Sequence, residues 1–231
     1  MIWYDYYYLI LVVPALILSV IAQISVKGTY KKMSKIRNSR NITGAAAAAR
    51  VLSYYGINNV RIEPINGELT DHYDPRTNVI RLSSKVFSGS SIAAVGIACH
   101  EAGHAAQHAQ NYSPIKVRNA ILPFANIGSS AGIWLAVIGY FLNFGILVDI
   151  GIILFAAVVL FQLVTLPIEF NASARAMKVI DETGMLSTEE QKGTRKVLTA
   201  AAMTLCCSTH CFYYVSFKTY SQVQIEGQLK L

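Results

Sequence analysis

The chain has 231 residues, of which 53% are hydrophobic and only 14% are charged, whereas roughly 25% of the residues in a typical soluble domain carry a charge. This composition argues against an ordinary soluble domain and favours a small domain joined to membrane spans. The net charge of +7 could indicate nucleic acid, but the basic residues cluster beside the apolar runs. Lipid headgroups and the orientation of the spans explain them better there. We therefore expect a lipid bilayer, and no nucleic acid, among the partners.

The first apolar run, residues 7–26, is long enough to cross a hydrocarbon core of about 30 Å. Aromatic residues lie at its start, and a cluster of Lys and Arg follows it. A cleavable signal peptide carries positive charge before its apolar run, but the only side-chain charge there is Asp5. We expect residues 1–26 to form an uncleaved transmembrane anchor, with the N-terminus outside and the next segment in the cytoplasm.

Residues 27–120 are expected to form a cytoplasmic part that begins with a helix. The pattern predicts this helix over about residues 44–55, with Thr43 or Asn41 as its N-cap and Gly56 as its stop. A glycine in that position can adopt the left-handed conformation that ends a helix.

Two short strands and another helix follow in the same part of the chain. Residues 60–62 and 79–82 read as strands, and the segment between them is rich in turn formers. A helix is predicted over about residues 92–110, with Ser90 or Ser91 as its N-cap. The fold class expected overall is mainly α, with a small β element on the cytoplasmic side of a multi-pass membrane protein.

This predicted helix carries the pattern His-Glu-x-x-His, at His100, Glu101 and His104. Positions four apart lie on one face of a helix, so the two imidazoles can bind one ion, and neutral imidazoles suit Zn²⁺. Glu101 lies beside them, where it can take a proton from a metal-bound water. The alternative is a helix with two surface histidines and an incidental glutamate. We expect one Zn²⁺ per chain, in a zincin-like arrangement.

Two further membrane spans are expected within residues 121–167. No Lys or Arg occurs between Arg118 and Arg175, as a bilayer requires and a soluble core helix does not. We place the second span over about residues 121–143 and the third over about residues 146–166.

These two predicted spans contain a pair of glycines and one aspartate that suggest specific roles. The spacing Gly128-x-x-x-Gly132 in the second span suits close packing of helices. Asp149, near the start of the third span, is expected to be solvated at the far membrane surface rather than to act inside the membrane.

Residues 168–204 are expected to return to the cytoplasm as helices. Pro167 marks the exit of the third span, and a helix is predicted from there to about residue 182, with Gly184 as its stop. Ser187-Thr188-Glu189-Glu190 resembles the start of another helix.

Residues 205–231 form a C-terminal tail that could be a degraded fourth span. The cluster Cys206, Cys207, His210 and Cys211 matches no zinc-finger or zinc-knuckle spacing, so free thiols are expected there. Cys99 is expected to point into packing, and the four cysteines show no disulfide framework of the secreted type.

A catalytic zinc site usually has three protein ligands, so a third is needed. The metzincin pattern fails, because its Gly and third His would fall at Gln107 and Gln110. His108 points along the helix instead of toward the ion, and Asp149 lies on the wrong side of the membrane. Glu169 is the first acid after the two crossings, on the same side as the histidines. We predict it as the third ligand; the alternative is a glutamate that only solvates a helix start.

Two resemblances to known families follow from these residues. The pair His100-Glu101-x-x-His104 and Glu169, separated by two spans, resembles the membrane gluzincins of the HtpX-like type. Residues 69–76 (Leu-Thr-Asp-His-Tyr-Asp-Pro-Arg) and 166–170 (Leu-Pro-Ile-Glu-Phe) resemble more closely the YugP-like membrane zinc metallopeptidases of bacteria. The resemblance covers about residues 1–204.

These resemblances also imply features that this chain fills differently. The HtpX-like pattern implies an Asp four residues after the ligand Glu, where this chain has Ser173. The YugP-like pattern implies a last apolar span near the C-terminus, where this chain has the tail that begins at Cys206.

The predicted function is a membrane zinc metallopeptidase that hydrolyses peptide bonds, with Glu101 as the general base. Its substrate would be a peptide or protein, including membrane proteins, and its site would lie at the cytoplasmic surface of a bacterial plasma membrane. The alternative is a non-catalytic zinc-binding scaffold or accessory protein. Such a site would be closed by a fourth protein ligand, and no convincing one is present in the sequence.

Residues outside the motif have predicted roles in binding substrate and the oxyanion. The strand Val79, Ile80, Arg81 and Leu82 could pair with an extended substrate by β-augmentation, or equally could pack over the active-site helix. A helper for the tetrahedral oxyanion is also needed, and its candidates are His72, Tyr73 and Arg175.

Overall fold

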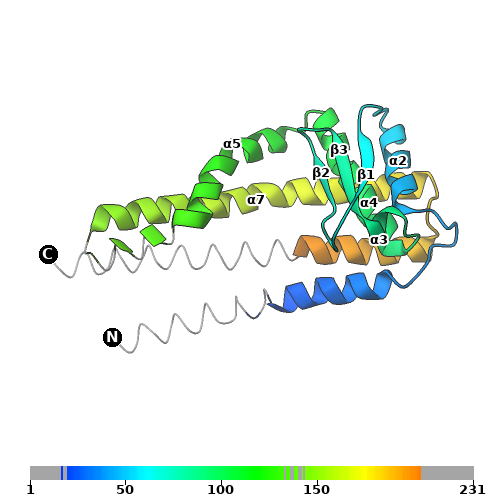
Figure 1. Ribbon diagram of the computed structural model, residues 1–231, viewed down its shortest axis with the longest axis horizontal. Helices are drawn as coiled ribbons and strands as arrows, with labels where there is room; N and C mark the ends of the chain where they lie inside the picture. The colour runs from blue at the N-terminus through cyan, green and yellow to red at the C-terminus, as the bar shows by residue number, and fades with distance from the viewer. Residues whose placement is uncertain are drawn as a thin grey trace. The chain divides into compact units, whose positions relative to one another are not determined.

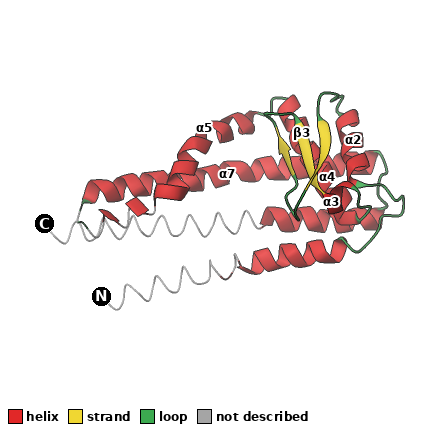
Figure 2. Cartoon of the chain, viewed as in Figure 1, coloured by secondary structure: helices red, strands yellow, loops and turns green. Residues whose placement is uncertain are grey.

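The computed structural model describes residues 17, 20–132, 134–135, 138–139, 142 and 144–203 (Figure 1). The chain divides into two compact units. The first comprises Met1–Ala22, Pro114–Leu166 and Thr204–Leu231, and the second comprises Gln23–Ser113 and Pro167–Met203. The described residues are mainly helical with one small sheet, as predicted (Figure 2).

The sheet lies in the second unit and has three strands in the order β1-β3-β2. Strand β1 (Arg61–Ile65) runs parallel to β3 (Val79–Ser83), with Arg61 opposite Val79. Strand β2 (His72–Asp74) runs antiparallel to β3, with Tyr73 opposite Ile80. The sequence predicted the first and last of these strands, whereas β2 falls in the segment read as turns.

The central position of β3 corrects one of the two roles predicted for Val79, Ile80, Arg81 and Leu82. Hydrogen bonds to β1 on one side and β2 on the other already occupy the backbone of this strand. A substrate peptide therefore cannot add to it by β-augmentation, since that mode needs a free edge. The side chains of Val79, Ile80 and Leu82 are fully buried, and α4 (Ile92–Ala109) packs on the strand. The packing role is the one that fits.

Helices surround this sheet and build the core of the second unit. Helix α2 (Gly44–Tyr54) packs against α4, and the short α3 (Ser84–Phe87) connects β3 to α4. The core contains Val51 of α2, Leu82 of β3 and Val95 of α4, together with Ile180 from the far end of the chain. Burial of these apolar side chains stabilises the unit by about 1.5–3 kcal/mol each.

Side-chain caps fix the starts of both helices where the sequence predicted them. Thr43 accepts a hydrogen bond from the backbone N–H of Ala46, and Ser91 accepts one from Ala94. Of the two alternatives given for each helix, the structure selects Thr43 and Ser91. Gly56, with φ of +67°, ends the first helix as expected.

Helix α7 (Gly145–Glu182) is longer than the sequence predicted. Pro167 lies inside it and does not end it, although a proline removes one backbone donor. The predicted third span and the predicted helix after it are therefore one continuous helix. After a turn at Gly184 (φ +59°), residues 188–203 form another helix. At this predicted helix start Ser187 and Glu190 form a capping box, in which the Glu190 carboxylate accepts a hydrogen bond from the Ser187 N–H at 2.8 Å.

The first unit contains α5 (Ser113–Ile127), the π-helical turn η1 (Gly128–Gly132) and the first part of α7. A Cβ on Gly128 would lie 2.1 Å from the Leu154 carbonyl oxygen, so this glycine allows the close packing predicted for it. Among the described residues, α7 is the one helix long and apolar enough to cross a membrane.

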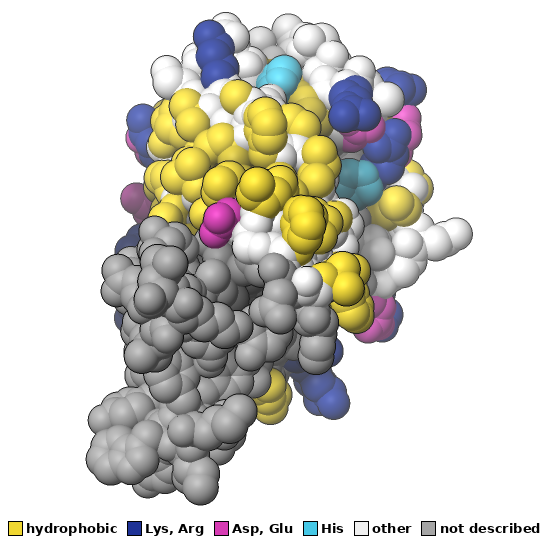
Figure 3. All heavy atoms as spheres, turned by 90° about the vertical axis from the view of Figure 1, so that its left-hand side faces the viewer, with side chains coloured by type: hydrophobic (Ala, Val, Ile, Leu, Met, Phe, Trp, Pro, Cys, Tyr) yellow, Lys and Arg dark blue, Asp and Glu magenta, His cyan; other side chains and the backbone are white. Residues whose placement is uncertain are grey.

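Several large hydrophobic side chains of α7 are exposed. Ile146, Ile153 and Leu160 each expose half or more of their surface. Figure 3 shows a continuous area of hydrophobic side chains on the described part of one face. Most of the predicted first span, part of the predicted second span and the whole C-terminal tail, including Cys206, Cys207, His210 and Cys211, lie outside the described residues.

Candidate metal centre

Two helices of the second unit bring the predicted ligands together. His100 and His104 come from α4, and Glu169 comes from α7, immediately after Pro167 and Ile168. Glu169 Oε2 lies 3.2 Å from His100 Nε2 and 3.5 Å from His104 Nε2. The two Nε2 atoms are 3.1 Å apart. All three side chains are largely buried, with 17–27% of their surface exposed.

The distances between these three atoms fit a zinc ion. Bonds of about 2.0–2.1 Å at a tetrahedral angle place neighbouring ligand atoms about 3.3–3.4 Å apart, close to the separations observed. Two imidazole nitrogens and a carboxylate oxygen also match the donor types that zinc prefers. Among the described residues, this is the group of His, Cys, Asp or Glu side chains that is close enough to hold a metal ion.

Gly103 allows the two helices to approach closely enough to form this group. A Cβ at this position would lie 2.6 Å from the carbonyl oxygen of Ala172, which is far below an ordinary contact. Because Ala172 lies on α7, between Glu169 and the end of the helix, a side chain at Gly103 would push α4 away from Glu169. A glycine is therefore needed at position 103 so that α4 and α7 can approach closely enough to bring the ligand residues together.

Each histidine has a hydrogen-bond partner on the ring nitrogen that points away from the cluster. His104 Nδ1 lies 3.1 Å from Gln107 Oε1, and His100 Nδ1 lies 3.1 Å from Ser173 Oγ. Partners of this kind orient metal-binding imidazoles and raise their basicity. Ser173 occupies the position where the HtpX-like pattern implies an aspartate, so in this chain the partner of His100 Nδ1 is a hydroxyl.

Neighbouring charges and burial change the pKa values of side chains at the centre. Burial acts to lower the pKa of His104, but a hydrogen bond with Glu169 and the negative charge of Glu101 outweigh it and raise the pKa. The excess of negative charge favours a bound cation in general, whether a proton or a metal ion. Cys99 is fully buried, as predicted, and burial raises the pKa of its thiol.

Glu101 lies on α4 next to His100 and is partly exposed. Its charge acts on the His104 ring, which places the carboxylate in the electrostatic neighbourhood of the cluster. Glu101 is not one of the three residues whose donor atoms converge. Its predicted role as general base stays a prediction.

Two of the oxyanion candidates, His72 and Arg175, make other contacts. His72 is exposed on β2, where its Nδ1 lies 2.8 Å from the Thr70 carbonyl oxygen. Arg175 donates to Asn171 Oδ1 at 2.7 Å and to Gln110 Oε1 at 2.5 Å. Its guanidinium also lies over aromatic rings of the same unit. These contacts hold Arg175 beside the residues that support the centre, and they do not place it at the three donor atoms.

Sequence reasoning missed the supporting residues Gln107, Asn171 and Ser173. Position 107 was considered only as a failed metzincin glycine, and position 173 only as a missing aspartate. Their spacing could have indicated this role. Gln107 lies three residues after His104, and Ser173 lies four residues after Glu169, so each shares a helix face with a ligand residue.

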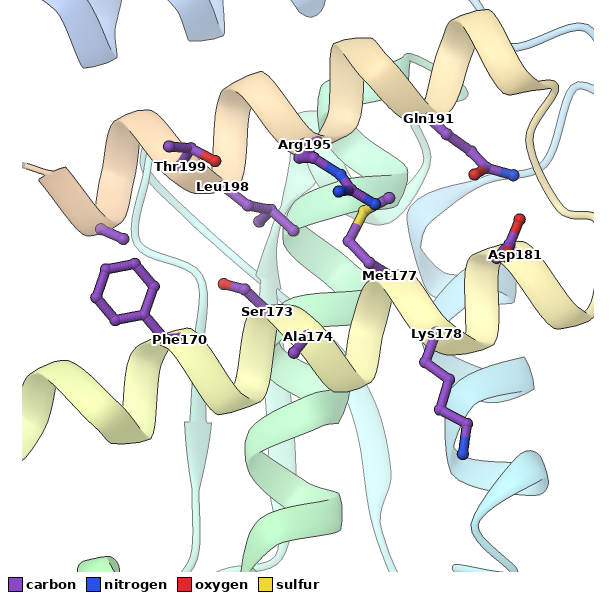
Figure 4. Close-up of a pocket in the computed structure, with 11 residues that line it drawn as sticks. Phe170, Ser173, Ala174, Met177, Lys178, Asp181, Gln191, Arg195, Leu198 and Thr199 are labelled. Atoms are coloured by element: carbon purple, nitrogen blue, oxygen red, sulfur yellow. The ribbon is translucent and has the colours of Figure 1, made fainter.

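A groove of about 490 Å³ runs along α7 (Figure 4). It lies between α7 and the helix of residues 188–203, and Figure 4 shows Ser173, Met177 and Leu198 among the side chains that line it. Apolar side chains form much of its wall, and Lys178, Asp181 and Arg195 lie along its length. Ser173 belongs both to this groove and to the hydrogen bond with His100, so the groove adjoins the metal centre.

Comparison with known proteins shows the family to which the chain belongs. Residues 8–212 match the family described as "Putative neutral zinc metallopeptidase", and the chain belongs to this family. The chain is also 45% identical over 197 residues to "Putative membrane protease YugP" of Bacillus subtilis (strain 168), which covers 85% of this chain and 88% of that protein. No solved structure matches the chain. The YugP-like resemblance drawn from the sequence motifs is thus confirmed.

Proposed function

We propose that the chain is a multi-pass membrane metallopeptidase in which His100, His104 and Glu169 hold one zinc ion. The observation that carries this proposal is the convergence of two Nε2 atoms and one carboxylate oxygen at separations of 3.1–3.5 Å. The family and the membrane protease relative support the same activity.

The chemistry divides between the ion and the side chains of the chain. Zinc bound at these residues would polarise the scissile carbonyl and lower the pKa of a water. Glu101, which follows His100 and contributes no donor atom to the cluster, accepts the proton of the attacking water and delivers it to the leaving amine nitrogen. The C–N bond of the substrate breaks and a C–O bond forms, so the step consumes one water.

The substrate is proposed to be a peptide with an apolar side chain next to the scissile bond. The groove beside α7 shares Ser173 with the metal centre and is lined by Phe170, Met177 and Leu198. An apolar side chain buried there would gain about 25 cal/mol for each Å² removed from water. This groove takes the substrate-binding role that the central position of β3 denies to that strand.

The membrane arrangement is also a proposal. Helix α7 has the length and composition of a span over its first part, and the cluster of Lys and Arg at residues 27–40 would lie on the cytoplasmic side. The second unit, which contains both the basic cluster and the metal centre, would then face the cytoplasm at the membrane surface.

The decisive experiment compares zinc content and proteolysis of the purified protein with those of the Glu101→Gln variant in detergent. We expect both proteins to retain zinc and only the unmodified chain to cleave unstructured apolar peptides. Zinc bound equally by both proteins, with no difference in cleavage of any substrate, would instead favour the zinc-binding scaffold.

A further inference from the structure

The contact that holds His104 in place comes from Gln107, a residue with no role in the motif. Gln107 is fully buried, with 0% of its surface exposed. Its Oε1 lies 3.1 Å from His104 Nδ1, and its Nε2 lies 2.8 Å from the Ile168 carbonyl oxygen and 3.0 Å from Asn171 Oδ1. Every polar atom of this buried amide therefore has a partner, as buried polar groups require.

The partner on Ile168 determines which way round the amide lies. A backbone carbonyl can only accept a hydrogen bond, so the NH₂ group of Gln107 must face Ile168. The amide oxygen then faces His104 Nδ1, and an oxygen can only accept. The proton of a neutral His104 ring must therefore be on Nδ1, which leaves the lone pair of Nε2 directed at the cluster.

His100 lacks an equivalent constraint. Its Nδ1 faces the Ser173 hydroxyl, which can either donate or accept a hydrogen bond. The contact with Ser173 orients the ring but leaves its tautomer open. The two histidines of the motif are thus held differently, and Gln107 is the residue that makes the difference.

Gln107 also connects the two ligand-bearing helices. It lies on α4, and the carbonyl that it binds belongs to Ile168, the residue before Glu169 on α7. Movement of Glu169 away from α4 would therefore break a buried hydrogen bond of the same side chain that orients His104.

We propose that Gln107 is a positioning residue that sets the metal-binding tautomer of His104 and holds Glu169 in register with it. This inference rests on the proposed zinc function of His100, His104 and Glu169. It goes beyond that function because it assigns a role to a residue that does not touch the ion.

The test uses two substitutions at Gln107 and a matched control. Gln107→Met keeps the length of the side chain but removes both the acceptor and the donor. Gln107→Glu keeps an oxygen for His104 Nδ1 but removes the donor to Ile168. Gln191→Met is the control, because Gln191 also donates to a backbone carbonyl, that of Leu186, without touching a ligand residue. Zinc affinity is measured by competition with a chromophoric chelator, and thermal stability is measured without metal.

The expected result is a separation of affinity from stability. Gln107→Met should weaken zinc binding by about 10–100-fold, the range found for partners of metal-binding histidines. Gln107→Glu should lose as much stability as Gln107→Met but bind zinc more tightly than it. Gln191→Met should keep the zinc affinity of the unmodified chain. Equal losses of affinity in both Gln107 variants, or no loss in Gln107→Met, would overturn the proposal.

A second measurement works without any substitution. Nitrogen-15 shifts of the histidine rings in the metal-free protein, in alkaline buffer, report which ring nitrogen carries the proton. We expect the Nδ1–H tautomer for His104, and the Nε2–H tautomer would overturn the inference even if the Gln107 variants fail to fold. Absence of zinc binding by the unmodified chain would refute the proposed function. The tautomer measurement needs no zinc, so it tests the role of Gln107 separately from that function.

Discussion

Gly103 and Ala172 face each other at the crossing of α4 and α7, where a Cβ on the glycine would lie 2.6 Å from the alanine carbonyl oxygen. Gly103 immediately precedes His104 on α4, and Ala172 lies three residues after Glu169 on α7. The separation of the ligand residues is therefore set by the absence of a side chain at one position, because closely packed interiors transmit a change of even one methyl group.

Gly103→Ala should weaken zinc binding and destabilise the second unit. The added methyl group meets backbone, which cannot move aside as a flexible side chain could, so overpacking should cost about 1–3 kcal/mol. Thermal unfolding and zinc titration in detergent measure the two effects.

The matched control for that variant is Gly28→Ala. Gly28 is helical, and a Cβ there would meet nothing within 4 Å. Alanine should stabilise this helix by roughly 0.5–1 kcal/mol. If both variants bound zinc as tightly as the unmodified chain, the close approach at Gly103 would have no part in forming the centre.

Glu169→Gln should lower zinc affinity by more than about 100-fold, beyond the range for residues that act only through a ligand. The amide has nearly the same shape as the carboxylate but no negative charge, so the loss reports the charge at Oε2. Glu189→Gln is the control, since Glu189 is exposed and pairs with Lys192 at 2.7 Å, away from the three converging residues. Zinc content after dialysis against a weak chelator separates the two variants; equal retention would show that Glu169 is not a ligand.

Asp74→Asn should reduce stability at neutral pH and lose its effect in acid. Hydrogen bonds from Thr77, Arg76 and Arg81 lower the pKa of Asp74 from 3.8 to about 2. A carboxyl whose pKa is lower in the folded state stabilises the protein above its unfolded pKa, and this contribution disappears as pH falls through the folded value.

The measurement is the difference in melting temperature between the metal-free unmodified chain and Asp74→Asn across the acidic range. The difference should be constant above pH 3.8, the ordinary pKa of the group. It should shrink toward zero near pH 2, which is about its pKa in the folded protein. A difference that stays constant down to the lower value would mean that these hydrogen bonds do not favour the carboxylate.

Leu198→Trp should raise the KM for apolar peptides while leaving zinc affinity unchanged. Leu198 lines the groove beside α7 and is not among the residues that approach the metal centre. A larger side chain would fill space that the substrate needs, and one methylene of misfit in an apolar pocket costs about 1–3 kcal/mol. Initial rates over a range of peptide concentrations give the KM. A normal KM would remove the groove from the substrate path.

The elements that depend on local chemistry could be predicted from the sequence alone. Thr43 and Ser91 were predicted as caps because a side-chain oxygen can satisfy the first N–H groups of a helix wherever that helix lies. His100 and His104 were predicted on one face because the period of a helix is fixed. Glu169 was selected by elimination among the acids that follow the motif, and its convergence with the histidines agrees with that choice.

Features that depend on neighbours distant in sequence could not be predicted in this way. The strand at Val79 looked the same in sequence whether it was an edge strand or a central one, and its partners β1 and β2 made it central. Pro167 looked like a helix end, but α7 continues through it. Gln107 acquired its role through Ile168, 61 residues away. Hydrogen bonds and packing between segments far apart in the sequence determine these features, so a local sequence pattern cannot predict them.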